Sequence, residues 1–123
     1  MRNSLEAALV RSVDAYKSNA VLVPEWARFA SLVVPAIDNG VVSLEVILKE
    51  NSSTAALLAS NDTGWMAIYD ESESAQVAAS GADPGCYDIT TYVRGLPDGC
   101  CIRAVCATQQ TTADVTFTFT FAN

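Results

Sequence analysis

Apolar and polar residues alternate without a break over residues 115–121, close to the end of the chain. One valine and three phenylalanines take every second position, and threonines take the positions between them. Successive side chains of a β-strand point to opposite faces of its sheet, so this period of two separates the aromatic residues from the threonines. The pattern predicts a half-buried strand that closes an all-β domain.

This strand contains no charged residue, and it lacks the lysine or proline that commonly protects the edge of a sheet. We therefore expect either a central strand that is covered on both sides or an edge that meets a partner. Thr118, in the middle of the threonine face, is the candidate interface residue. A charge at this position is expected to be harmless if the face meets solvent and to block assembly if it is an interface.

Further strand-like runs precede this one. Residues 21–23 and 29–34 each end at a proline, which has no N–H to donate to a ladder. Residues 42–48 alternate in the same way as the last strand, with Ile47 as the exception. Additional strands are predicted over 65–69, 76–79, 87–93 and 100–107, the last two as a pair joined by a Pro-Asp-Gly turn at 97–99.

Seven or eight short strands at this spacing indicate an antiparallel β-sandwich or a jelly roll over residues 21–123. Residues 1–20 are ambiguous. Apolar residues from Leu5 to Tyr16 fall near helical spacing, and Asn3 with Glu6 three positions later is typical of a helix start. A short amphipathic helix is predicted here, with an extended N-terminal arm or a first strand as the alternative.

The length, charge and composition of the chain limit the size of its fold and the kinds of partner that it can bind. The 123 residues are enough for one domain that buries about two-thirds of the surface its unfolded chain exposes. The net charge of -7 and the scattered arginines argue against nucleic-acid binding, since a phosphate backbone would be repelled. No apolar run approaches the roughly 20 residues that cross a membrane. No signal peptide is recognised, so synthesis in a cytoplasm is expected.

The chain contains few residues suited to catalysis or to metal binding. It has no histidine, which removes the commonest general base and the commonest metal ligand, so neither an enzyme nor a cofactor is expected. Asp70, Glu71 and Glu73 are candidate calcium ligands, but a solvated acidic loop is favoured because the sequence around them lacks a calcium-binding loop pattern. No metal site is predicted.

The four cysteines lie in the C-terminal third, and their spacing does not match zinc knuckles. Cys100 and Cys106 share strand parity with Ile102 and Ala104, which predicts small core residues. A disulfide from Cys86 to one of the later three cysteines is left open, for the case that the protein meets an oxidising medium.

Aromatic residues are the remaining candidates for a binding site. Rings stack on sugars, and neighbouring Asp or Asn side chains bind hydroxyl groups, so a sugar-binding face is one hypothesis. The favoured alternative is that these residues belong to the core or its edge, as most Trp and Tyr in a small sandwich do. The residues concerned are Trp26, Trp65, Tyr69, Tyr87 and Tyr92.

Residues 20–123 resemble a family of small β-sandwich virion structural proteins of tailed bacteriophages. The resemblance is carried by Trp26 ahead of the run Ala-Ser-Leu-Val-Val-Pro-Ala at 30–36, and by the strand pattern at 42–48. It continues in Ser-Asn-Asp-Thr-Gly-Trp at 60–65, which leads into Ile-Tyr-Asp at 68–70, and in Tyr-Asp-Ile-Thr at 87–90 and Ile-Arg-Ala at 102–104.

The resemblance implies a capsid decoration or cement protein that bridges capsomers on the outer surface of a phage head. Its partners would be the major capsid protein or other virion proteins, it would form a homo-oligomer with a trimer favoured, and it would reside in the virion. The family supplies no catalytic residues. The alternative function is a carbohydrate- or receptor-binding module of a tail or head fibre.

Overall fold

The computed structural model describes residues 1–38, 40–48, 64–69, 76–78 and 84–123. These residues form two antiparallel sheets packed face to face, so the predicted all-β sandwich is confirmed. The elements are β1 (Arg2–Leu9), β2 (Val21–Leu22), β3 (Phe29–Val34), β4 (Val42–Ile47), β5 (Met66–Ala67), β6 (Gln76–Ala78), β7 (Gly85–Asp88), α2 (Thr90–Val93), β8 (Cys101–Cys106) and β9 (Val115–Ala122).

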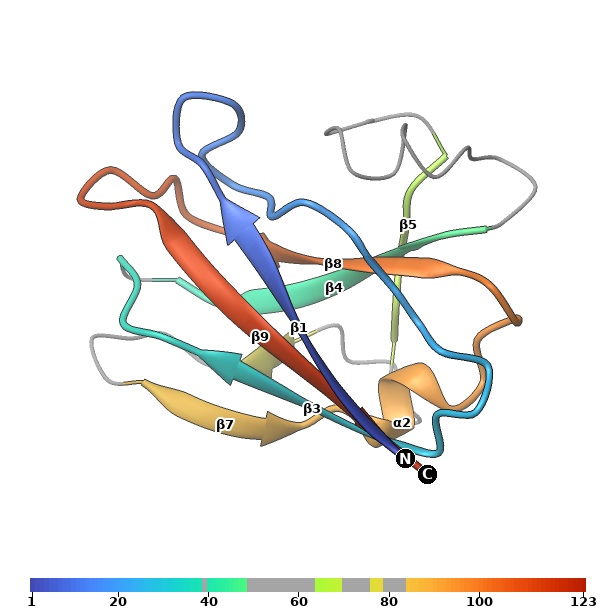
Figure 1. Ribbon diagram of the computed structural model, residues 1–123. Helices are drawn as coiled ribbons and strands as arrows, with labels where there is room; N and C mark the ends of the chain where they lie inside the picture. The colour runs from blue at the N-terminus through green and yellow to red at the C-terminus, as the bar shows by residue number, and fades with distance from the viewer. Residues whose placement is uncertain (39, 49–63, 70–75, 79–83) are drawn as a thin grey trace.

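The strands pair as a nested hairpin. β1 pairs with β9, β2 with β8, β3 with β7 and β4 with β5. Successive pairs belong to alternate sheets, which gives the orders β1-β9-β3-β7 and β2-β8-β4-β5, with β6 also beside β4. A long hairpin wrapped into two sheets in this way is a jelly roll. Figure 1 shows the two layers, with the N- and C-termini side by side at the foot of β1 and β9.

β9 provides the centre of the core. Val115 is 5% exposed, and the three phenylalanines of the strand are fully buried between the sheets. β1 and β3 pair with β9 on its two sides, so β9 is a central strand rather than an edge. Its threonines point to the outer surface, where Thr116 is exposed and Thr118 half-buried. The predicted separation of aromatic and threonine faces is confirmed.

The helix predicted within residues 1–20 is wrong, and the alternative of a first strand holds. Arg2–Leu9 pairs with β9 along its whole length. The apolar positions Leu5, Ala7 and Leu9 also fit a period of two, and β9 supplies backbone partners from the far end of the chain. Because Ala7 and Leu9 are fully buried, β1 belongs to the sandwich and is not a separate arm.

The pairing predicted between residues 87–93 and 100–107 is also wrong. β7 ends at Asp88 and pairs with β3, whereas β8 pairs with β2 and β4 in the other sheet. Asp88 Oδ1 accepts a hydrogen bond of 2.9 Å from the Thr90 N–H, and Ala30 N–H donates to Thr90 Oγ1 at 3.1 Å. These contacts favour the short helix α2 over the strand that the β-branched residues suggest. The turn predicted at 97–99 leads into β8, and Gly99 takes the left-handed φ of 75°.

Phe117→Ala tests the role of β9. Removing this fully buried ring leaves a cavity between the sheets, and the free energy of unfolding is expected to fall by about 3–5 kcal/mol. Thr116→Ala, one position away on the exposed face, is the matched control, for which a loss within about 1 kcal/mol is expected. Urea unfolding followed by tryptophan fluorescence measures both. Equal losses for the two variants would contradict the assignment of the faces.

Candidate functional site

The outer face of the β1-β9-β3-β7 sheet presents side chains from four strands in rows that run across them. The register places Ser4, Thr120, Ser31 and Asp88 side by side in one polar row. Ser4 Oγ and Thr120 Oγ1 are 2.9 Å apart, which is a hydrogen bond between neighbouring strands. This row is therefore a continuous band of hydroxyl groups that ends at a carboxylate.

The adjacent row of the same face is more apolar. It contains Glu6, Thr118, Val33 and Cys86, again one residue from each strand. Val33 is 38% exposed, and the Cys86 side chain is exposed as well. The candidate interface residue Thr118 thus lies at the centre of an outward-facing surface, beside an exposed valine.

A hollow of about 350 Å³ crosses the end of this face that lies near the chain termini. Phe29, which is 57% exposed, forms its apolar wall, and Arg2 and Asp88 place opposite charges at its border. Hydrogen bonding by Thr90, through its side chain and its backbone N–H, lowers the pKa of Asp88. Asp88 is therefore ionised at neutral pH, and the hollow combines an aromatic ring, hydroxyl groups and two charges.

Phe29 and Arg2 were not singled out from the sequence, and Asp88 appears there only within the segment Tyr-Asp-Ile-Thr at 87–90. A signal for Phe29 exists, because it shares the outward parity of Ser31 and Val33 in β3 while the residues between them are buried. An aromatic residue on the polar parity of a strand indicates an exposed ring. No linear pattern joins Arg2 to Asp88, since strand register alone brings them to one hollow.

The structure does not gather the predicted aromatic residues on one face. Tyr92 is 8% exposed within the core, and Trp26 and Tyr87 pack against the core as partly buried residues. Tyr69 is 60% exposed and follows β5, which belongs to the second sheet. Trp65 belongs to a small separate apolar cluster with Ala20, Ile47 and Cys101.

Trp65 contacts a buried arginine on the outer side of the second sheet. The guanidinium carbon of Arg103 lies 4.1 Å from the centroid of the Trp65 ring. Its Nε donates to Glu45 Oε1 at 2.9 Å, and Nη2 lies 2.7 Å from the same oxygen. Arg103 is 1% exposed, so the charge needs this paired carboxylate and the aromatic face. Trp65 therefore holds Arg103 in place and is not a free stacking platform.

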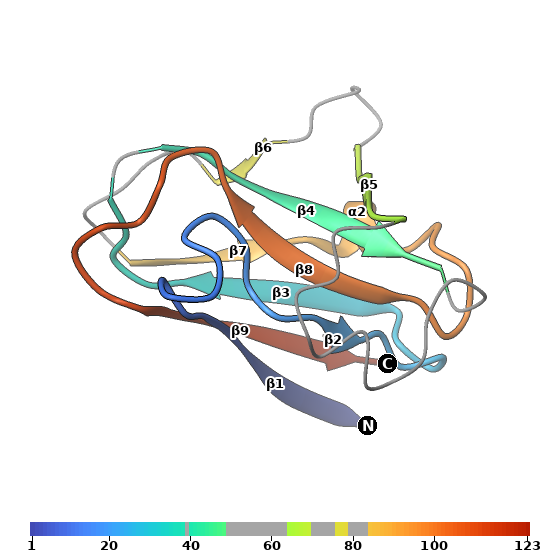
Figure 2. The same ribbon diagram turned by 90° about the horizontal axis from the view of Figure 1, so that it is seen from above.

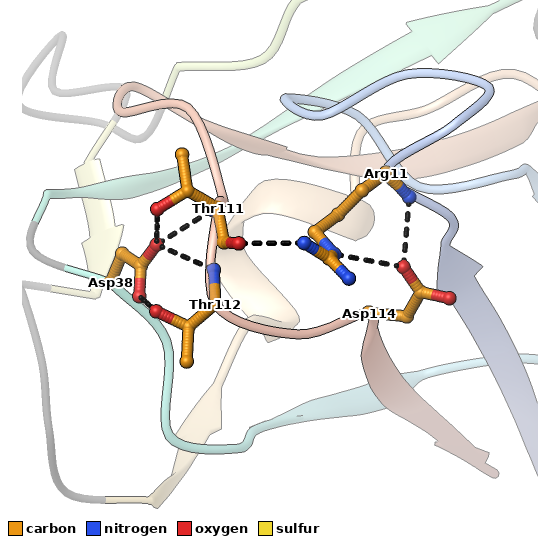
Figure 3. Close-up of polar contacts among 5 residues, drawn as sticks. All are labelled: Arg11, Asp38, Thr111, Thr112 and Asp114. Carbon is orange, nitrogen blue, oxygen red and sulfur yellow. Dashed lines mark hydrogen bonds and ion pairs between the residues drawn. The ribbon is translucent and has the colours of Figure 1, made fainter.

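A polar cluster ties together loops at one end of the sandwich (Figure 3). Asp38 Oδ2 accepts hydrogen bonds from Thr111 N–H at 2.7 Å, Thr111 Oγ1 at 3.0 Å and Thr112 N–H at 3.3 Å. Its Oδ1 accepts a fourth from Thr112 Oγ1 at 2.8 Å. The bond from the Thr111 backbone is the main cause that lowers the pKa of Asp38. The loop before β4 thereby holds the loop between β8 and β9.

Arg11 holds the same β8–β9 loop from its other side. Arg11 N–H and Nε donate to Asp114 Oδ1 at 3.0 and 3.2 Å, and Nη1 donates to the Thr111 carbonyl at 2.6 Å. The loop after β1 also carries Val13 and Tyr16, which are 70% and 43% exposed. This end of the sandwich is a set of three loops tied by hydrogen bonds, with apolar side chains on its surface.

The cysteines are free thiols, and three of them are core residues. Cys100 and Cys106 are 0% and 2% exposed, which confirms the prediction from strand parity. Burial raises the pKa of Cys101 and of Cys106 to about 11, so these thiols are neutral and poor nucleophiles at pH 7. Cys86 alone of the four is exposed, on β7.

Within the described residues, no three His, Cys, Asp or Glu side chains come together as a metal site. In the same part of the chain, no helix has the length and apolarity needed to span a membrane. The candidate calcium ligands Asp70, Glu71 and Glu73 lie outside the described residues.

Comparison with protein-family models, with curated proteins and with solved structures finds no match to this chain. The resemblance to phage virion proteins therefore rests on residue patterns alone. Fold alone does not assign a function, whereas the chemistry of the exposed surfaces indicates what the chain can bind.

Asp38→Ala tests the loop cluster and its dependence on pH. A carboxyl group whose pKa is lowered by folding stabilises the protein above its unfolded pKa, near 3.8, and this contribution is lost as the pH falls through the folded pKa. We expect Asp38→Ala to lower the melting temperature at pH 7 and to differ less from the parent protein below pH 3.8.

The control for this prediction is Glu25→Gln, which removes one negative charge at an exposed position. Amide hydrogen exchange gives a local measurement, because the Thr111 and Thr112 amides donate to Asp38. Both amides are expected to exchange faster in Asp38→Ala and to be unchanged in Glu25→Gln. A melting temperature difference that stays constant from pH 7 to pH 2 would contradict this account.

Proposed function

We propose that this chain is a bacteriophage virion structural protein, a capsid decoration protein that binds the outer surface of the head and bridges neighbouring capsomers. The observation that carries the proposal is the outer face of the β1-β9-β3-β7 sheet, where Phe29 and Val33 are exposed on a surface made by four strands. Exposed apolar side chains framed by polar groups are typical of protein interaction sites.

Two further observations support this function. The residue patterns over 20–123 resemble phage virion proteins, and the jelly roll is a fold that recurs in viral capsid domains, which is an analogy at the level of the fold. Decoration needs a rigid surface repeated many times, since weak contacts add up over a lattice. A sheet face loses little conformational entropy on docking, because its side chains are already held by their neighbours.

Because β1 is part of the sandwich, deletion of the N-terminal residues is not a suitable test of capsid binding. An N-terminal arm could be deleted without damage to the domain, but removal of residues 1–20 would strip β9 of one neighbouring strand. Loss of capsid binding after such a deletion would report unfolding rather than a lost contact. Point substitutions on the outer face are therefore the appropriate variants.

Thr118→Glu is the main test of the proposal. It places a charge at the centre of the face, beside Val33 and next to Glu6 in the same row. Burial of this charge against a capsid is expected to weaken binding by at least about tenfold, which corresponds to about 1.4 kcal/mol. Phe29→Ser is expected to weaken binding in the same direction. Co-sedimentation with capsids stripped of the protein measures occupancy.

The matched control is Tyr69→Ser, which removes a similarly exposed aromatic ring just after β5, away from the proposed docking face. It is expected to leave occupancy unchanged, and all three variants are expected to keep the parent circular dichroism spectrum. Full occupancy of Thr118→Glu on capsids would overturn the proposed docking face. Electron microscopy of the intact particle separates a head protein from a tail component by position and copy number.

The alternative function is a carbohydrate- or receptor-binding module, and the hollow beside Phe29 favours it. The Phe29 ring lines this hollow of about 350 Å³ together with Ser31, Asp88 and Arg2. Such a combination of stacking and hydrogen-bonding groups suits a sugar. Sugar binding would be lost in Phe29→Ser and in Asp88→Asn and retained in Thr118→Glu, because Thr118 does not line the hollow. A glycan array with these variants separates the two functions.

A further inference from the structure

The outer side of strand β1 is an open edge. β1 is the first strand of its sheet, with β9 on one side, and Figure 2 shows it as the outermost strand of its layer. In an antiparallel pair, residues alternate between those that bond to the neighbouring strand and those whose backbone groups point away. Asn123 N–H donates to the Met1 carbonyl, so the backbone N–H and C=O groups of the odd-numbered residues of β1 point to β9. Those of the even-numbered residues point outward, to the open edge.

Asn19 marks one end of this open stretch. It donates its N–H to the Ala8 carbonyl at 2.9 Å and accepts from the Ala8 N–H through Oδ1 at 2.8 Å. Within the described part of the chain, no backbone partner occupies the outward N–H and C=O groups of Arg2, Ser4 and Glu6. Three successive outward-facing residues of β1 are therefore free to bond with another strand.

Apart from the charges of Arg2 and Glu6, β1 lacks the features that keep an edge from pairing. It is eight residues long, contains no proline or lysine, and keeps a regular register with β9 from end to end. The edge strands β2 and β5 of the other sheet are only two residues long. Of the described strand edges, β1 is the one that offers a long and regular template.

We propose that two copies of this chain pair antiparallel through their β1 edges, around a twofold axis at Ser4. Ser4 then lies opposite Ser4 of the second copy, and Arg2 lies opposite its Glu6, while Glu6 lies opposite its Arg2. The outward N–H and C=O groups of all three residues are satisfied. The two four-stranded sheets become one continuous sheet across the dimer.

The charges of β1 select this register. Only outward-facing residues bond across the edge, so even-numbered residues must lie opposite even-numbered ones. An axis at Arg2 would oppose two arginines, and an axis at Glu6 would oppose two glutamates, both unfavourable across strands. An axis at Asn3 or Leu5 leaves one charge of each copy opposite serine. Only the axis at Ser4 pairs every Arg2 with a Glu6.

This pairing does not depend on the proposed virion role, and it is tested on the purified protein in solution. Arg2→Glu places two glutamates opposite each other, and Glu6→Arg places two arginines opposite each other. Each single variant is expected to weaken dimerisation at least tenfold, with a smaller effect in high salt. The double variant R2E/E6R restores the opposite charges and is expected to dimerise like the parent.

A mixture of the two single variants gives a second readout. Arg2→Glu alone and Glu6→Arg alone are expected to be monomers, but together they complement each other and form a heterodimer. Sedimentation equilibrium at matched concentrations measures all these species. Glu25→Arg and Arg28→Glu are the controls, because they change net charge by the same amounts at exposed positions outside β1.

The register is tested by cross-linking in a Cys86→Ser background. Directly opposed hydrogen-bonded residues have Cα atoms about 5.5 Å apart, within the range that a disulfide spans. Ser4→Cys is expected to form a covalent dimer on mild oxidation, whereas Arg2→Cys and Glu6→Cys are not. A monomeric parent at all concentrations, a trimer that ignores the charge reversals, or self-cross-linking of Arg2→Cys or Glu6→Cys would overturn the proposal.

Discussion

The packing of three phenylalanines from β9 between the two sheets is the contact on which the rest of the structure depends. Phe117, Phe119 and Phe121 are all fully buried, and a slip of one residue in register would turn all three to the outer surface. The register of β1 and β3 against β9 is therefore strongly specified. Both neighbours place their own small and aliphatic residues over the same core, so the whole four-stranded sheet is aligned by one strand.

The outer surface follows from the same register. Once the phenylalanines point inward, the threonines of β9 must point outward, and each lies in a row with one residue of β1 and one of β3. The same register decides which backbone N–H and C=O groups of β1 point to the open edge, because residues that bond to β9 alternate with residues whose groups point away from it. Thr118 and Ser4 thus owe their positions to the burial of residues on the other parity.

Local alternation made much of this fold predictable. The strands Phe29–Val34, Val42–Ile47 and Val115–Ala122 lie where their periods place them. Non-local pairing was not predictable, since β1 takes its partner from the far end of the chain, and Thr90 bonds to Ala30 to begin a helix in a β-branched segment. The candidate surface was missed for the same reason: its rows exist only after four strands are aligned.

The outer face and the open edge of the β1-β9-β3-β7 sheet use different groups of the same strands. The face offers the side chains of Phe29, Val33 and Thr118, whereas the edge offers backbone groups of β1, with the charges of Arg2 and Glu6 to select the register. Binding of a partner to the outer face therefore leaves the β1 edge available for pairing, and pairing through the edge leaves the face available. A dimer through β1 would carry two outer faces side by side in one sheet, and binding of the first face would raise the effective concentration of the second. An outer face that binds too weakly to keep a single copy on a repeating lattice would then keep a dimer bound, because the dimer binds through two faces.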